Sequence, residues 1–185
     1  MISTTSTDYE LIKAIRDRRN KSAFETIVHR YEEKVLRLCF RILSVRAEAE
    51  DIAQDIFTKL WEHPDDWQPK ATFSTWLYRV TTNRCLNRLR FLKVKSILSL
   101  SSDVKMERHS DSSVNSPESE VLSMEKSKLF HRVFRKLPGR QKAALHLRYW
   151  EDLSVKDVAD ALGITVKSAE SLIYRGKRTL GSGLG

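Results

Sequence analysis

Residues 154–180 read SVKDVADALGITVKSAESLIYRGKRTL, and this stretch decides the fold of the C-terminal part of the chain. Ser154 can cap a two-turn amphipathic helix, with an acidic residue three positions later completing the capping pair. Gly163 follows the small residue Ala159 by four positions, where a tight turn needs left-handed backbone. This spacing predicts a helix-turn-helix, and a plain helical hairpin with a solvated charged face is the alternative.

The second helix of this motif, which Thr165 can cap, carries a polar and basic outer face. Helices of this kind lie in the major groove of duplex DNA, where Arg and Glu read base edges and Ser, Tyr and Lys hold phosphates. We expect Val166 to face inward with the other apolar residues of the helix, and Gly176 to cost about 1 kcal/mol relative to Ala. The candidate duplex contacts are Lys167, Ser168, Glu170, Ser171, Tyr174, Arg175 and Arg178.

The rest of the chain also reads as helical, because apolar residues recur at helical spacing and no strand pattern of useful length appears. We expect Asp8 to cap the first helix, and Ser22 with Glu25 to form a capping box on the second. The helix that opens the C-terminal part has Pro117 in its first turn. The expected helices lie at about 8–18, 22–42, 47–62, 74–93, 117–136 and 140–149, before the helix-turn-helix.

A segment rich in serine and faintly acidic, residues 96–118, separates the two helical blocks. It has too few apolar residues to bury itself, so we interpret it as a flexible linker. The sequence therefore predicts an all-α protein with two small helical domains, residues 8–95 and residues 119–181. The first of them would be a four-helix domain.

Composition restricts the class of protein. Lys and Arg outnumber Asp and Glu by 33 to 24, and the net charge of +9 favours a polyanionic partner. The two cysteines, Cys39 and Cys85, are expected to be packing residues, since two thiols make neither a disulfide framework nor a metal site. The sequence predicts no catalytic centre, no metal site and no cofactor. It also shows no apolar run long enough for membrane insertion, so we expect a cytoplasmic protein.

Residues 79–95 carry several cations and no acidic residue. Basic and aromatic groups on one surface suit single-stranded DNA, because aromatic rings stack on bases while cations follow the backbone. Arg79, Arg84 and Arg88 are the phosphate-binding candidates, with a solvated basic face as the alternative. Core packing against Trp61 or Trp76 is one interpretation of Trp67, and we weigh it equally with the base contact that the family resemblance described below implies. Trp76 is assigned to the core, and the role of Tyr78 stays open.

Residues 137–180 resemble region 4 of the extracytoplasmic-function sigma factors, a group of the sigma-70 family. The N-terminal block resembles region 2 of the same family in three consecutive pieces. These are FETIVHRYEEKVLRLCFRIL at 24–43, AEDIAQDIFTKLWE at 49–62 and FSTWLYRVTTNRCLNRLR at 73–90. The resemblance implies a transcription-initiation factor that is not an enzyme. It also implies core RNA polymerase and promoter DNA as partners, with an anti-sigma factor expected as a regulator.

The resemblance further implies which residues act. The first domain would dock on the clamp helices of the largest polymerase subunit and recognise the melted minus-ten strand, capturing one flipped base. The second would read the minus-thirty-five duplex and dock on the flap of the second-largest subunit, although Glu170 stands where many relatives carry Arg. The implied polymerase contacts are Asp51, Gln54, Asp55, Thr58 and Lys59. The implied minus-ten contacts are Trp67, Tyr78, Arg79, Asn83, Arg84, Asn87 and Arg88.

Two other classes of protein carry helix-turn-helix modules. A repressor or activator would bind duplex DNA alone, usually as a dimer, and the acid-free basic helix after Arg79 argues against it. A recombinase would need a nucleophilic Ser or Tyr or a carboxylate centre, and no such constellation appears in the sequence. Gel shifts with and without core polymerase separate the first alternative from an initiation factor.

Overall fold

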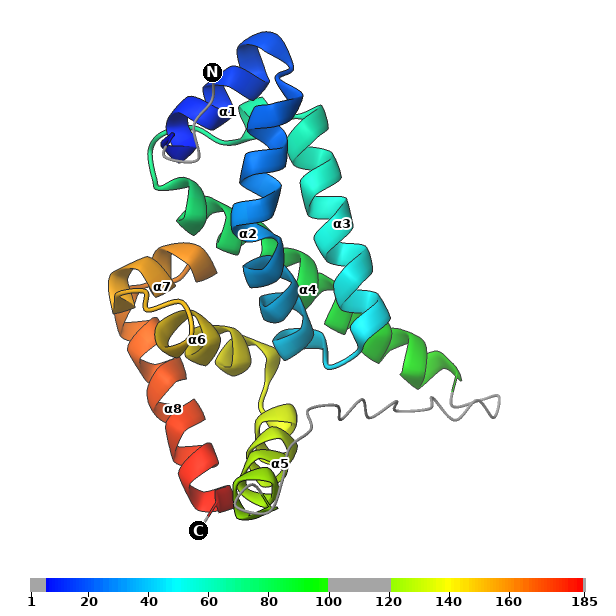
Figure 1. Ribbon diagram of the computed structural model, residues 1–185. Coiled ribbons are helices and arrows are strands. Elements are labelled where there is room, and N and C mark those ends of the chain that lie inside the picture. The colour runs from blue at the N-terminus through cyan, green and yellow to red at the C-terminus, as the bar shows by residue number, and fades with distance from the viewer. Residues whose placement is uncertain (1–5, 100–120, 185) are drawn as a thin grey trace.

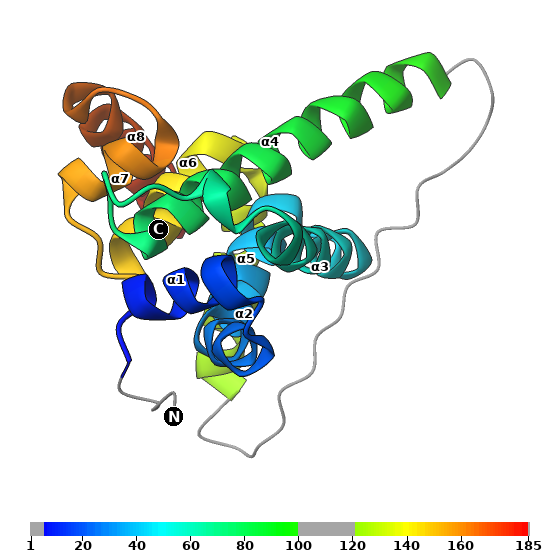
Figure 2. The ribbon, with the colours of Figure 1, turned by 90° about the horizontal axis from the view of Figure 1, so that it is seen from above.

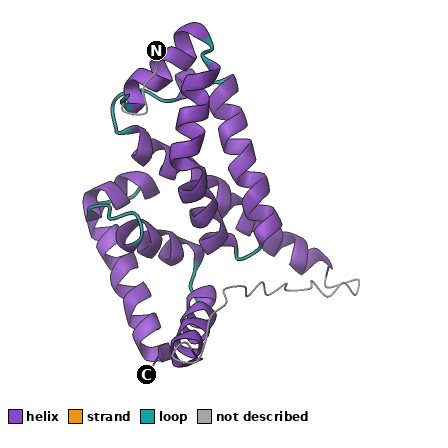
Figure 3. Cartoon of the chain, viewed as in Figure 1, coloured by secondary structure: helices purple, strands orange, loops and turns teal. Residues whose placement is uncertain are grey.

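The computed structural model describes the backbone of residues 6–99 and 121–184 and the side chains of residues 6–95 and 128–184. Within these ranges the chain is helical with no strand, which confirms the all-α prediction (Figure 3). The helices are α1 (Asp8–Arg18), α2 (Lys21–Leu43), α3 (Arg46–Glu62), the short 3-10 helix η1 (Pro64–Asp66) and α4 (Phe73–Ser99). After the gap come α5 (Val121–Lys136), α6 (Gly139–Tyr149), α7 (Val155–Leu162) and α8 (Val166–Leu184).

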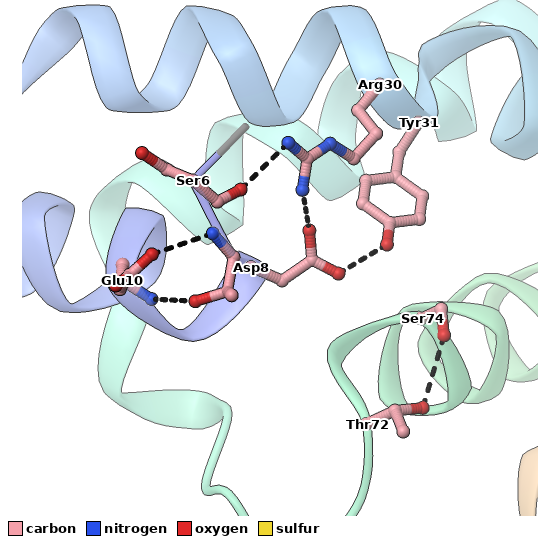
Figure 4. Close-up of polar contacts among 8 residues, drawn as sticks. Ser6, Asp8, Glu10, Arg30, Tyr31, Thr72 and Ser74 are labelled. Atoms are coloured by element: carbon pink, nitrogen blue, oxygen red, sulfur yellow. Dashed lines mark hydrogen bonds and ion pairs between the residues drawn. The ribbon is translucent and has the colours of Figure 1, made fainter. Parts of the chain in front are cut away.

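The first two helices begin at residues other than the expected caps. Thr7 caps α1 in a capping box with Glu10, and Asn20 caps α2 by accepting a hydrogen bond from Ala23. The Asp8 carboxylate instead pairs with Arg30 and accepts a hydrogen bond of 2.5 Å from the Tyr31 hydroxyl, which joins α1 to α2 (Figure 4). The expectations for Asp8, Ser22 and Glu25 are therefore wrong, because a side chain one or two residues earlier satisfies the free N–H groups.

Helices α1 to α4 form the N-terminal unit around a continuous apolar interior (Figure 1). Phe73 is buried in it, with its ring in T-shaped contact with the rings of both Tyr31 and Trp67. Cys39 and Cys85 are fully buried as free thiols in the same interior. Both cysteines therefore act as packing residues, as expected.

Helix α4 is 27 residues long and ends at Ser99. Most of the helix packs on α2, α3 and α7, and its last turns project away from the other helices (Figure 2). The first four residues of the segment interpreted as a linker are therefore helical. The remainder of that segment, with Pro117, lies outside the described residues.

The C-terminal unit contains the expected helix-turn-helix in α7 and α8. Ser154 caps α7, Gly163 adopts the left-handed backbone at φ 62°, and the Thr165 hydroxyl accepts from the N–H of Ser168 at the start of α8. Val166 is 44% exposed, so its expected inward position is wrong. It stands in the first turn of α8, before the helix reaches the apolar interior.

The two units pack directly against each other, which nothing in the sequence pattern predicts. Helix α6 lies on α2, and α7 lies on α4, so that buried apolar residues of both units form one connected cluster (Figure 1). The basic helix is not enclosed by this contact, because Arg79, Asn83 and Asn87 remain exposed.

Gly176 lies where α8 packs against α6. A Cβ at this position would lie 2.8 Å from Cδ1 of Leu145, which is buried, so that this side chain would have to shift within the interior. We predict that Gly176→Ala lowers the free energy of unfolding by about 1–3 kcal/mol through overpacking, despite the better helix propensity of Ala. Urea-induced unfolding followed by circular dichroism measures the change.

Gly181 is the matched control on the same helix, since nothing lies within 4 Å of a Cβ placed there. We expect Gly181→Ala to raise the free energy of unfolding by up to about 1 kcal/mol. Equal effects of the two substitutions would show that α8 does not approach α6 as described.

Candidate nucleic-acid interface

The outer face of α8 forms the first candidate surface. All seven residues expected to contact duplex DNA are exposed on it, and Tyr174 is 65% exposed. Lys177 extends the basic character of the surface toward α6, with its Nζ 5.6 Å from the centre of the Tyr149 ring. The first turn of the helix is exposed at Val166, Lys167 and Ser168, and Ser168 is held by hydrogen bonds with Thr165. The whole face is accessible to a groove of DNA.

The second candidate surface lies on α4, and only part of it is accessible. Arg79, Asn83 and Asn87 are exposed, and Arg84 and Arg88 are partly exposed. Trp67 and Tyr78 are 4% and 3% exposed, so neither ring is open to a base in this arrangement. The structure thus brings the polar candidates together along one helix and places the two aromatic candidates in the interior.

The position of Trp67 follows from contacts within the N-terminal unit. Its ring packs edge-on against Phe73 and Tyr9, and its Nε1 donates to the carbonyl oxygen of Ala71. The backbone carbonyl of Trp67 in turn accepts from Arg16 of α1. Of the two interpretations that the sequence left equal, this arrangement corresponds to core packing.

Tyr78 is covered by the C-terminal unit. Its hydroxyl donates a hydrogen bond of 2.6 Å to the carboxylate of Glu151, which follows α6. Lys34 of α2 lies 3.9 Å from the same carboxylate oxygen, and Nε2 of His146 lies 3.4 Å from the other oxygen. The Glu151 side chain is only 3% exposed, so a buried carboxylate joins α2, α4 and α6.

The protonation of this cluster follows from burial and from the polar groups around the carboxylate. Burial alone would raise the pKa of Glu151, but His146 and Tyr78 favour its ionised form, and the net effect lowers that pKa. Burial lowers the pKa of His146, which keeps its ring neutral at neutral pH. The pKa of Tyr78 is raised by burial and by the carboxylate that it faces. The pair is therefore an ionised Glu151 beside a neutral imidazole.

Two further contacts hold the units together. The guanidinium of Arg41 lies 4.1 Å from the centre of the Trp150 ring, and the His146 ring stacks on the same indole with the ring centres 5.7 Å apart. The buried Nζ of Lys142 donates to the carbonyl oxygen of Ile42 and to the hydroxyl of Ser44, which lie at the C-terminal end of α2. Burial lowers the pKa of Lys142 to about 8.

Sequence reasoning missed Glu151, His146, Lys142 and Arg41 as residues of a contact. Each of them stands in an ordinary helical or loop context, and only the packing of one unit on the other brings them together. No local pattern could have identified the set.

The polar face of α3 forms a third surface. Asp51, Gln54, Thr58 and Lys59 are exposed, and Asp55 is partly exposed. Beside this face, α2 and α3 enclose an open groove of about 660 Å³. Its floor is apolar, with Phe24, Phe57 and Trp61 among its lining residues, and its rim carries Glu32, Glu33 and Glu50.

Ion pairs connect the α3 face to α4. Arg84 Nη1 lies 2.9 Å from the carboxylate of Asp55, and Arg88 pairs with Glu48 through two nitrogens. Glu48 was not among the sequence-based candidates. Two of the three arginines expected to hold phosphates therefore already have carboxylate partners.

The described residues contain no group of three or more metal-ligating side chains. None of the helices in the same part of the chain combines the length and apolar character needed to cross a bilayer. Helix α4 exposes cations and amides, and the outer face of α8 exposes cations and hydroxyl groups. Both surfaces can bind a polyanion.

Comparison with known proteins agrees with this geometry. Residues 27–93 match the model for Sigma-70 region 2, and residues 127–180 match the model for Sigma-70, region 4. The chain is 33% identical to the ECF RNA polymerase sigma factor SigW of Bacillus subtilis, over 87% of this chain and 88% of the relative. It is 30% identical to the RNA polymerase sigma-H factor of Pseudomonas aeruginosa, over 98% of this chain and 95% of the relative.

Two solved structures share the fold. One is CnrH in complex with the cytosolic domain of CnrY, with a TM-score of 0.67 and 20% identity over 96% of each chain. The other is the sigma factor RpoE of Bartonella quintana in complex with the anti-sigma factor NepR. Its TM-score is 0.69 at 18% identity, over 87% of this chain and 96% of that one.

Removing the Tyr78 hydroxyl tests the contact between the units. We predict that Tyr78→Phe lowers the free energy of unfolding by about 1–3 kcal/mol, because the buried carboxylate of Glu151 loses a hydrogen-bond donor. Chemical denaturation at neutral pH measures the loss. Tyr174→Phe is the matched control at an exposed tyrosine, and we expect a change within about 0.5 kcal/mol. A loss of the same size in both variants would contradict the contact.

Acidification should weaken the same contact. Burial lowers the pKa of His146 below its ordinary value of 6.5, so the unfolded chain binds a proton that the folded chain resists. The contribution of His146 to the free energy of unfolding is fully present above pH 6.5 and decreases as the pH falls below that value. Glu151 offsets part of the pKa shift, and Arg41 and Arg37 add to it. Melting temperatures measured across this range should fall less steeply for His146→Gln than for the wild type. His29→Gln, at an exposed position, should leave the slope unchanged.

Proposed function

The chain belongs to the extracytoplasmic-function sigma factors of the sigma-70 family, and from this we propose that it directs initiation through two separate DNA surfaces. A sigma factor is a transcription-initiation factor of RNA polymerase and not an enzyme. In our proposal, α8 reads the minus-thirty-five duplex, and α4 holds the melted minus-ten strand. The units that do this correspond to residues 119–181 and 8–95. The site of action would be the cytoplasm.

The observation that carries the proposal is the exposure of the whole outer face of α8. Lys167, Arg175 and Arg178 supply cations for phosphates or guanine edges, and Ser171 and Tyr174 supply hydroxyl groups between them. Because a recognition helix must enter the major groove, a face with no packed neighbour is the physical requirement. Glu170, which is also exposed, favours a base that offers an amino group.

The minus-ten surface is supported by the cations and amides of α4. Arg79, Asn83 and Asn87 are exposed along one side of the helix. Trp67 and Tyr78 can join this surface only after the contact with the C-terminal unit or the local packing changes. We propose that the two units separate when the protein binds polymerase, which would uncover Tyr78.

The α3 surface is our proposed site for the clamp helices of the largest polymerase subunit. Asp51, Gln54 and Thr58 are exposed there beside an apolar groove with an acidic rim. A polar helix face next to an apolar groove suits a partner helix that is basic and amphipathic. The flap of the second-largest subunit would contact the C-terminal unit.

An anti-sigma factor is the proposed regulator. The structurally similar RpoE was solved with the anti-sigma factor NepR, and CnrH was solved with the cytosolic domain of CnrY. We propose that a protein of this kind binds the present chain and keeps it from polymerase.

Run-off transcription with purified core polymerase and a promoter library tests the function. We predict transcripts that require both core polymerase and this protein. Replacing Arg175, which is exposed on α8, with Ala should reduce transcription about 5- to 100-fold on a promoter with its minus-thirty-five element. The same substitution should have little effect when that element is scrambled.

Two controls accompany this experiment. Arg18→Ala, at an exposed position at the end of α1, should leave transcription near the wild-type level. Gel shifts of the protein alone should show no promoter-specific complex, whereas the protein with core polymerase should form one. Specific binding of duplex DNA by the isolated protein as a dimer would favour a repressor or activator instead.

A further inference from the structure

Two arginines of α4 are held by carboxylates of α3. Glu48 accepts from both Nε and Nη2 of Arg88, the second at 2.7 Å, and Oδ2 of Asp55 forms an ion pair with Nη1 of Arg84 at 2.9 Å. Both arginines belong to the set that we propose for the backbone of the melted strand. Both carboxylates lie on the neighbouring helix, one of them on the proposed polymerase face.

The pair between Glu48 and Arg88 is the more enclosed of the two. The Glu48 side chain is 19% exposed, compared with 42% for Asp55. The hydrogen bond from Arg88 lowers the pKa of Glu48, so the carboxylate is ionised at neutral pH. The ring of Phe91 lies 5.4 Å from the guanidinium, so the arginine has an aromatic neighbour as well as its carboxylate.

A carboxylate and a phosphate bind an arginine side chain in the same way. Each offers two coplanar oxygen atoms that accept from two parallel N–H groups of the guanidinium. Since Glu48 uses Nε and Nη2 of Arg88, a DNA phosphate that binds the same fork must displace it. The two contacts are therefore mutually exclusive.

We propose that Glu48 occupies the place of a DNA phosphate on Arg88 in the free protein and thereby lowers its affinity for single-stranded DNA. This inference rests on the proposed function of α4. Asp55 likewise occupies the place of a DNA phosphate on Arg84. Because Asp55 is also a proposed polymerase contact, a polymerase group that binds Asp55 releases Arg84 for DNA. Polymerase binding and strand binding then strengthen each other, as linkage requires.

The test uses the full-length protein and a fluorescent single-stranded DNA oligonucleotide, with binding measured by anisotropy over a range of salt concentrations. In Glu48→Gln the side chain keeps its size and loses its charge, which releases Arg88. We expect the affinity to rise about two- to fivefold, the change that corresponds to one partly exposed ion pair. The plot of log affinity against log salt should steepen by about 0.7, as for one additional phosphate contact.

Glu50→Gln is the matched control. Glu50 lies on the same helix and pairs with Arg46 of that helix, so its substitution adds the same charge without releasing Arg88. We expect no more than a small rise in affinity and no change of slope. Equal rises in the two variants would overturn the proposal, because the effect would then be one of net charge.

A double variant identifies the arginine that responds. In an Arg88→Met background, Glu48→Gln should no longer raise the affinity, whereas an unchanged rise would overturn the proposal. Glu48→Asp keeps the charge but shortens the side chain, and it should give a smaller rise in the same direction if Glu48→Gln proves unstable. A fall in affinity in either variant would show that Glu48 prepares Arg88 for DNA instead of competing with it.

A parallel measurement separates this inference from the proposed function. Wild-type protein with core polymerase should retain the same oligonucleotide when it carries a minus-ten sequence. Failure of that complex to retain it would refute the proposed role of α4. Retention together with equal affinities of free wild type and Glu48→Gln would refute only the inference about Glu48.

Discussion

The buried carboxylate of Glu151 determines how the two halves of the chain sit against each other. It accepts a hydrogen bond from Tyr78 of the N-terminal unit, lies beside His146 of its own unit, and faces Lys34 across the boundary. Removing a carboxylate from water is unfavourable unless its oxygens find such partners. Oε2 accepts from Tyr78 beside Lys34, whereas Oε1 has no hydrogen-bond partner among the described residues, so the contact tolerates only a narrow set of arrangements.

The distribution of charged side chains differs from one surface of this protein to another, and the net charge alone does not describe it. The net charge is +9, yet the carboxylates of α3 lie directly beside the arginines of α4. The outer face of α8 has no comparable set of carboxylates and is free of neighbours. The surface proposed for duplex DNA is thus open in the free protein, while the surface proposed for single-stranded DNA is partly covered and partly neutralised.

Much of the fold could be predicted because its signals are local. The left-handed Gly163, the cap at Ser154 and the end of α3 at His63 all depend on residues within one or two helical turns. The caps of α1 and α2 could not be placed as well, because neighbouring Thr7 and Asn20 compete with the expected residues for the same N–H groups. Gly176 looked unfavourable within a helix, and only the approach of Leu145 explains it. The contacts of Glu151 and Glu48 join helices far apart in the sequence, so no local pattern could reveal them.

The two buried thiols have a consequence for how this protein can respond to its surroundings. Cys39 and Cys85 are fully buried, and the neighbouring Cys39 together with burial raises the pKa of the Cys85 thiol. Since only an accessible thiolate reacts readily with peroxides or electrophiles, neither residue is suited to sense oxidants in the folded chain. Surface cysteines introduced for maleimide dyes would therefore be labelled with little background, and the distance between the two units could be followed by energy transfer.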